Sequence, residues 1–194
     1  MDYRNRFALG LLTFIMGISA FAVSSREEDL VYKTTVEGKE LHFLVNYPVD
    51  WEATDHRPAV VLFHGGGWSS GSYTGFVKHT DYLVSRGLVV FRIQYRLLKK
   101  KEPQIPNICT QDARSAMRYV RAHASRFGVD PAKLISMGGS AGGQLAAAVA
   151  IENGLDDDQD DLSVSSKPQA MVLFNPVLDL IGEVEKRGAS LTQK

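Results

Sequence analysis

The sequence of 194 residues has almost no cysteine and no excess of charge of either sign. Its one cysteine, Cys109, cannot form a disulfide within the chain, and we interpret it as a small buried side chain near the start of a helix. Nothing around it is typical of an activated catalytic thiol. Lys and Arg number 22, as do Asp and Glu, so the formal net charge is zero. The basic residues are scattered, which argues against a nucleic-acid partner.

Charge is also missing from residues 7–25, which follow two arginines near the N-terminus. Ala20-Phe21-Ala22 supplies small residues at the spacing that a signal peptidase requires. We therefore predict a signal peptide over residues 1–22. Its cleavage would leave residues 23–194 as a secreted or periplasmic domain without stable membrane association. A retained membrane anchor is the alternative, although the stretch is only weakly apolar.

Apolar runs alternate with helical patterns in the rest of the chain. Strands are expected at 30–35, 41–47, 59–63, 88–95, 134–137 and 170–174, and helices at 76–86, 112–124 and 142–151. The runs AVVLF (59–63) and AMVLF (170–174) are typical of strands buried on both faces. This alternation predicts one α/β domain with a mostly parallel sheet covered by helices. Asp112 is expected in the first turn of its helix, where a negative charge suits the helix dipole.

The acidic segment 156–161, DDDQDD, lacks the glycine at position six and the acidic residue at position twelve of an EF-hand loop. We interpret it as a solvated loop. The sequence therefore predicts neither a metal site nor a cofactor.

The segment Gly138-Gly-Ser-Ala-Gly142 matches the nucleophile elbow G-x-S-x-G. It lies between an expected strand and an expected helix, as that motif requires. Gly138 and Gly142 allow the strand and the helix to approach each other, and the helix N-terminus favours negative charge near Ser140. Ser140 is therefore the candidate catalytic nucleophile, and a tight turn without chemistry is the alternative.

A second motif, His64-Gly65-Gly66-Gly67-Trp68, follows the expected strand 59–63. Backbone N–H groups in such an open glycine loop can bind the oxyanion that forms during acyl transfer. A phosphate-binding loop would instead continue with Lys and then Ser or Thr. We expect the His64 ring and Gly65 to support the loop. Trp68 either lines a substrate pocket or packs beneath the loop.

These two motifs resemble those of the α/β-hydrolase family, in its hormone-sensitive-lipase-like and secreted esterase branch. The segments Tyr95-Arg96-Leu97 and Gly128-Val129-Asp130-Pro131 are similar as well. The resemblance implies an α/β-hydrolase three-layer sandwich with Ser140 as nucleophile. It also implies backbone donors at Gly66, Gly67 and Ala141, with no metal or organic cofactor.

A further similarity narrows the expected substrate. Ser166-Lys167-Pro168, a strand and then Asn175-Pro176-Val177 resemble exported esterases that act in plant-polysaccharide breakdown. The expected partners are therefore small or polysaccharide-linked acetyl or feruloyl esters. A peptidase or amidase on the same fold is an alternative.

The sequence also lacks a histidine after Ser140, since all five of its histidines precede that residue. The family order is serine, acid, histidine. We therefore expect that the last strands of the sheet, the catalytic acid and the histidine are missing. Such a partial domain would be inactive, with an exposed sheet edge that promotes aggregation. The alternatives are His79 or His123 as an unusual base, or a non-catalytic binding module.

Overall fold

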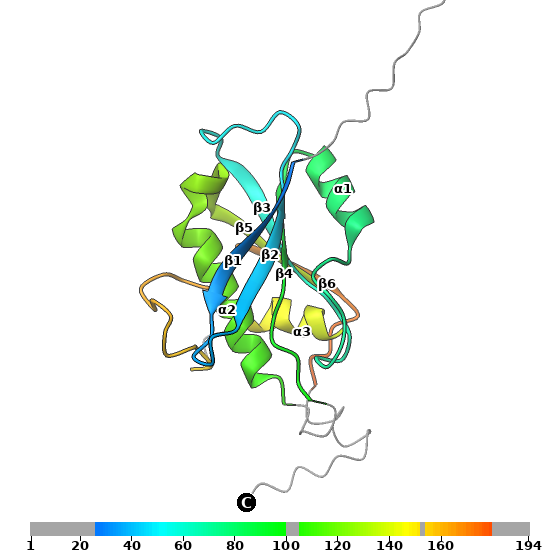
Figure 1. Cartoon of the computed structure of the whole chain (residues 1–194). Coiled ribbons are helices and arrows are strands. Elements are labelled where there is room, and N and C mark those ends of the chain that lie inside the picture. Colours follow the sequence, from blue (N-terminus) through cyan, green and yellow to red (C-terminus); the bar gives the residue numbers. More distant parts are fainter. Residues whose placement is uncertain (1–25, 100–104, 152–153, 180–194) are drawn as a thin grey trace, which may run out of the picture.

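The computed structural model describes residues 26–99, 105–151 and 154–179 (Figure 1). The predicted signal peptide therefore lies outside the described residues. Within these ranges, no helix has the length and apolar character needed to cross a membrane.

Six strands form one mixed sheet in the order β1-β2-β4-β3-β5-β6. They are β1 (Glu27–Thr34), β2 (Glu40–Asn46), β3 (Arg57–Phe63), β4 (Val89–Ile93), β5 (Val129–Gly139) and β6 (Ala170–Phe174). The pairs β1–β2 and β2–β4 are antiparallel, and the pairs among β4, β3, β5 and β6 are parallel. The carboxyl ends of β3, β4, β5 and β6 therefore meet at one edge, where ligands bind in open α/β sheets.

Helices cover both faces of the sheet, which confirms the predicted three layers (Figure 1). α1 (Val77–Ser85) lies on one side, and α2 (Asn107–Ala122) and α3 (Ala141–Ala148) lie on the other. A short 3-10 helix, Ala124–Phe127, follows α2 and ends at Gly128, whose φ is +60°.

The alternation of side chains along β3 divides the core in two. Val61 and Phe63 pack toward α2 and α3 in the larger cluster, and Val60 and Leu62 pack toward α1 with Val84. Because successive side chains of a strand point to opposite faces, a central strand that is apolar throughout can fill both layers.

Three sequence-based expectations need correction. Asp112 lies in the second turn of α2, because that helix begins at Asn107 and takes in the residues that follow Pro106. β5 is much longer than the expected 134–137 and starts at Val129. β6 forms where predicted, but it is not buried, since it lies at the edge of the described sheet.

Candidate active site

Ser140 occupies a sharp bend between β5 and α3. Its φ of 54° and ψ of −118° lie outside the regions that L-residues favour, and such strain concentrates at functional sites. The Ser140 N–H donates to the carbonyl of Phe174 at 2.8 Å, which holds the bend against the end of β6. The side chain of Ser140 is exposed. The bend therefore presents a hydroxyl to solvent at the carboxyl edge of the sheet.

Two glycines allow the close packing around this bend. A Cβ atom at Gly138 would meet the backbone of Gly142, and one at Gly142 would meet the carbonyls of Phe63 and His64. Both positions therefore exclude any side chain. The elbow motif thus has the close strand-to-helix approach predicted from the sequence.

The glycine loop after β3 lies directly beside Ser140. A Cβ atom at Gly65 would be 3.6 Å from the Cβ of Ser140 and 2.9 Å from the carbonyl oxygen of Gly139. The two sequence motifs are 76 positions apart, counting from His64 to Ser140. The parallel pairing of β3 with β5 brings them together, with Phe63 opposite Gly138.

The loop leaves backbone N–H groups free beside the serine. Gly66 and Gly67 have φ values of 123° and 58°, and the Gly66 carbonyl accepts from the N–H groups of Ser69 and Ser70. Within the described residues, no hydrogen bond uses the N–H of Gly66 or Gly67. Ala141 is the first residue of α3, so its N–H has no acceptor within that helix. The three N–H groups of Gly66, Gly67 and Ala141 are thus available to an oxyanion.

The His64 side chain packs beneath the glycine loop, between Tyr95 and the Gly65 carbonyl. Its ring stacks on Tyr95 at a centroid distance of 4.3 Å, and its Nδ1 lies 2.8 Å from the Gly65 carbonyl. The Tyr95 hydroxyl donates to the His64 carbonyl at 2.8 Å. Burial lowers the pKa of His64 and so favours the neutral ring, and the tautomer with hydrogen on Nδ1 would donate to the Gly65 carbonyl. This geometry agrees with the supporting role expected for His64.

Trp68 is buried rather than open to a substrate. Its side chain is 3 % exposed, and its Nε1–H donates to Oε1 of Gln144 at 3.1 Å. This arrangement favours the packing alternative. The sequence did not point to Gln144, although its position four residues after Ser140 places it at the end of the first turn of α3, on the same side of the helix as Ser140.

No histidine within the described residues hydrogen-bonds Ser140. His79 packs its ring against Phe76 and Phe174, at centroid distances of 5.2 and 6.0 Å. His123 stacks on Tyr119 at the end of α2, with its Nδ1 2.8 Å from the Tyr119 carbonyl. Neither ring is in the position of a general base.

Cys109 is fully buried in the first turn of α2, as predicted. Its Sγ donates to the carbonyl of Arg96 at 3.1 Å, and burial raises its pKa to about 12. Such a thiol is not a nucleophile at neutral pH.

The acidic segment 156–161 is only partly a solvated loop, which corrects the sequence interpretation. Asp157 bonds Lys33 of β1 at 2.6 Å, and Arg118 bonds Asp156 at 2.6 Å and Asp160 at 2.9 Å. Lys33 also reaches the buried Asp112 at 3.2 Å. The segment is therefore tied to α2 and β1 by ion pairs that the sequence does not reveal.

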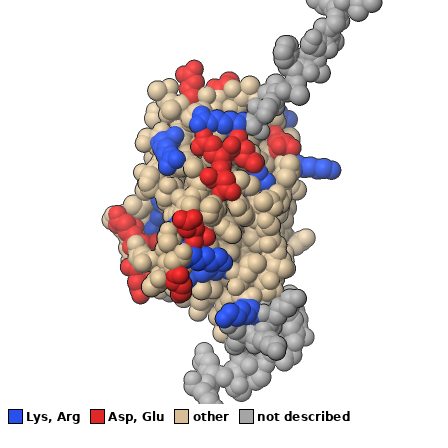
Figure 2. Space-filling view, viewed as in Figure 1, with Lys and Arg blue, Asp and Glu red and all other residues tan. Residues whose placement is uncertain are grey.

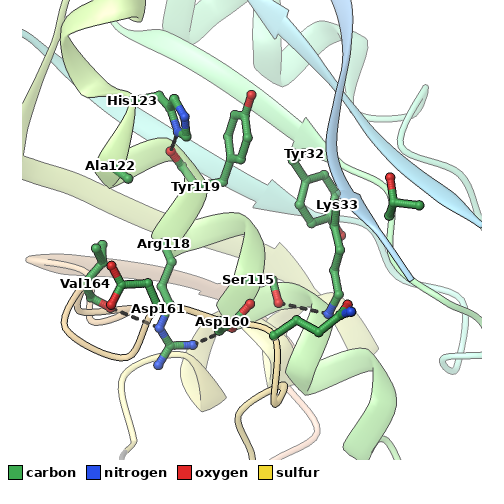
Figure 3. Close-up of a pocket in the computed structure, with 12 residues that line it drawn as sticks. Tyr32, Lys33, Ser115, Arg118, Tyr119, Ala122, His123, Asp160, Asp161 and Val164 are labelled. Atoms are coloured by element: carbon green, nitrogen blue, oxygen red, sulfur yellow. Dashed lines mark hydrogen bonds and ion pairs between the residues drawn. The ribbon is translucent and has the colours of Figure 1, made fainter. Parts of the chain in front are cut away.

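A cavity of about 340 Å³ lies between β1, α2 and this segment (Figure 3). Lys33, Arg118 and Asp160 line it, and each of them has a partner within the protein. On the face seen in Figure 2, acidic and basic side chains are interspersed. Within the described ranges, no cluster of three or more His, Cys, Asp or Glu side chains could hold a metal ion.

The fold and this site define an α/β-hydrolase with a nucleophile-elbow motif. A family model described as BD-FAE matches residues 47–190, and the chain belongs to that family of hormone-sensitive-lipase-like esterases. Esterase 2 of Thermogutta terrifontis, solved after phosphorylation by paraoxon, is 40% identical with a TM-score of 0.74. The match covers 78% of this chain and 58% of that one.

The curated relatives include a carboxylesterase and a protein named for another activity. Carboxylesterase NlhH of Mycobacterium tuberculosis is 35% identical over 100 residues, which are 50% of this chain and 30% of that protein. Endo-1,4-beta-xylanase B of Butyrivibrio fibrisolvens is 25% identical over 125 residues, which are 63% of this chain and 20% of that protein. The chain thus spans about a third or less of the length of these two relatives.

Proposed function

We propose that this chain carries the nucleophile and the oxyanion site of a carboxylic ester hydrolase. Ser140 Oγ would bond to the ester carbonyl carbon while its proton passes to a general base. The N–H groups of Gly66, Gly67 and Ala141 would hold the oxyanion. The alcohol would then leave with a proton, and water would release the acid from the acyl-enzyme. The observation that carries this proposal is the exposed, strained Ser140 beside a loop with free N–H groups.

The general base is the part of the machinery that the described residues do not supply. His64 is buried under the loop, and neither His79 nor His123 reaches Ser140. We therefore expect the chain by itself to show little or no ester turnover. The same observation favours a non-catalytic binding module as a second candidate.

Covalent labelling of Ser140 distinguishes the two candidates, because it needs one attack rather than turnover. The full chain is incubated with paraoxon, with and without added imidazole as an external base, and is mapped by mass spectrometry. We expect one diethylphosphoryl group on the peptide that contains Ser140, formed faster with imidazole and absent in Ser140→Ala. Ser125→Ala, which removes an exposed serine of the 3-10 helix, is the matched control and should label normally. No adduct on Ser140 even with imidazole would leave the binding module as the better candidate.

For the substrate we propose acetyl or feruloyl esters linked to plant polysaccharide. Support comes from the xylanase relative and from the residues around Pro168 and Pro176 noted in the sequence. An acetylated xylo-oligosaccharide should slow the labelling of Ser140, and the deacetylated sugar should not. If an aminoacyl anilide slows the labelling of Ser140 equally, an amidase is favoured. If the acetylated oligosaccharide does not slow the labelling, the proposed polysaccharide-linked substrate is wrong.

We also propose that the protein is exported. Expression of the complete sequence in a bacterial host, followed by N-terminal sequencing of the exported protein, should give Val23 as the first residue. Recovery of an uncleaved, membrane-bound chain would instead support the anchor.

A further inference from the structure

One hydrogen bond connects the two elements that carry the free N–H groups. The indole Nε1–H of Trp68, in the glycine loop, donates to Oε1 of Gln144, in α3. Both side chains are buried, at 3 % and 8 % exposure. Gly66 and Gly67 precede Trp68 directly, and Ala141 lies three residues before Gln144. The bond therefore links the loop that carries the Gly66 and Gly67 N–H groups to the helix that carries the Ala141 N–H group.

The loop needs such an external support because its own backbone is unfavourable. Gly66, Gly67 and Trp68 all have positive φ values, and Trp68, at 59°, has a Cβ atom that makes this conformation costly. Its carbonyl accepts from the N–H of Leu98 at 2.8 Å, and its ring lies in the larger core cluster. The hydrogen bond to Gln144 holds Nε1, the one polar atom of the Trp68 ring.

Gln144 is in turn fixed relative to the nucleophile. Its N–H donates to the carbonyl of Ser140 at 3.1 Å, in the first turn of α3. A side-chain amide has little reason to be buried at an apolar helix face unless it pairs with a polar group. The indole N–H of Trp68 is that group.

We propose that Gln144 is a positioning residue, which sets the distance between the glycine loop and the N-terminus of α3 through Trp68. This inference rests on the proposed function, since the distance matters for an oxyanion held from both sides. Donors must lie close to the position that the developing negative charge will occupy, and small misplacements are costly. Gln144 itself touches neither Ser140 Oγ nor substrate in this role.

The test compares Gln144→Leu, which removes the acceptor, with Gln144→Glu, which keeps an acceptor oxygen on a side chain of the same length. Labelling of Ser140 by paraoxon is followed against reagent concentration in the full chain. For Gln144→Leu we expect a limiting rate about tenfold lower, with the half-saturating concentration unchanged. Gln144→Glu should stay within about threefold of the parent rate. Trp68→Phe should match Gln144→Leu, and the double variant should be no slower.

Amide hydrogen exchange gives a second readout that does not depend on labelling. In Gln144→Leu the loop amides of Ser69 and Ser70, which donate to the Gly66 carbonyl, should exchange about tenfold faster, while those of β3 stay unchanged. Gln144→Glu and Ser140→Ala should leave both segments unchanged. Parent-like labelling and exchange in Gln144→Leu would overturn the role of Gln144 and leave Ser140 as nucleophile. If the parent does not label, the proposed function fails and exchange alone decides whether Gln144 holds the loop.

Discussion

Two strands with almost the same sequence have opposite environments in this protein. Residues 59–63 of β3 read AVVLF, and β6 reads AMVLF. Every one of those β3 residues is at most 2 % exposed, whereas Met171, Val172 and Phe174 are 47 %, 40 % and 43 % exposed. The apolar run decides that both segments form strands. It does not decide whether they are buried.

The difference comes from their neighbours. β3 pairs with β4 on one side and β5 on the other, with α1 over one face and α2 and α3 over the other. Within the described residues, β6 pairs with β5 alone. An apolar cavity of about 370 Å³ lies between α1 and β6, with Tyr82 and Met137 in its wall. Apolar surface of this kind is typical of protein interaction or aggregation sites.

The largest expected effect comes from placing a charge at the middle of each strand. Val61→Asp puts an unpaired carboxylate in the core and should cost more than about 4 kcal/mol, enough to unfold most of the chain. Val172→Asp should change stability by about 0.5 kcal/mol or less, because that side chain reaches water. Urea denaturation followed by circular dichroism measures both. An equal loss in the two variants would show that β6 is covered in solution.

The next comparison removes the aromatic ring that ends each strand. Phe63 is fully buried, so Phe63→Ala should cost about 3–5 kcal/mol through lost burial and the cavity left behind. Phe174→Ala should cost about 1 kcal/mol or less, and its backbone carbonyl can still accept from Ser140. The same denaturation experiment applies. A cost for Phe174→Ala within the range expected for Phe63→Ala would contradict the assignment of β6 as an open edge.

A smaller effect concerns the segment that leads into β6. Burial alone would raise the pKa of Asp157, but its bonds to Lys33 and to the Gln159 N–H lower it below the ordinary 3.8. Since the folded pKa lies below the unfolded value, the charged Asp157 stabilises the fold above pH 3.8, and this contribution disappears as pH falls through the folded pKa. Asp157→Asn should therefore cost about 1–2 kcal/mol at pH 7.

Thermal melts across the acidic range check this prediction. The difference between Asp157→Asn and the parent should close once the pH falls well below 3.8. Asp158→Asn, an exposed neighbour, is the matched control and should melt like the parent at every pH. A difference that persists in strong acid would show that the charge of Asp157 is not its cause.

The smallest effect on stability, within about 0.5 kcal/mol, is expected for Met171→Lys, which tests the exposed surface itself. A lysine on an edge strand opposes pairing with other chains, so hydrophobic-dye binding and aggregation should both fall. Val36→Lys changes a valine that is 80 % exposed outside β6 and serves as the control. If both variants lower dye binding equally, the surface of β6 is not where the dye binds.

Local sequence was sufficient for most elements and for the elbow. The six strands and three helices all form in the predicted order, although β5 and α2 begin five residues earlier than predicted, and Ser140 has the strained, exposed conformation that its motif indicates. The environments of Trp68, Asp112 and Asp157 could not be predicted in this way. Each of these residues has its partner far along the chain, in Gln144, Arg96 and Lys33 respectively.

By itself the sequence determined which segments are strands or helices and which serine lies at a glycine-lined bend. These properties depend on side-chain periodicity and on backbone freedom within a few residues. Only the tertiary structure decided that β6 is an edge strand of the described sheet and that the Gly66–Gly67 loop lies beside Ser140. It also decided that the Gln144 side chain bonds to Trp68 and so links the glycine loop to α3. Burial and contacts between distant segments depend on which strands become neighbours, and that is a property of the whole packed sheet.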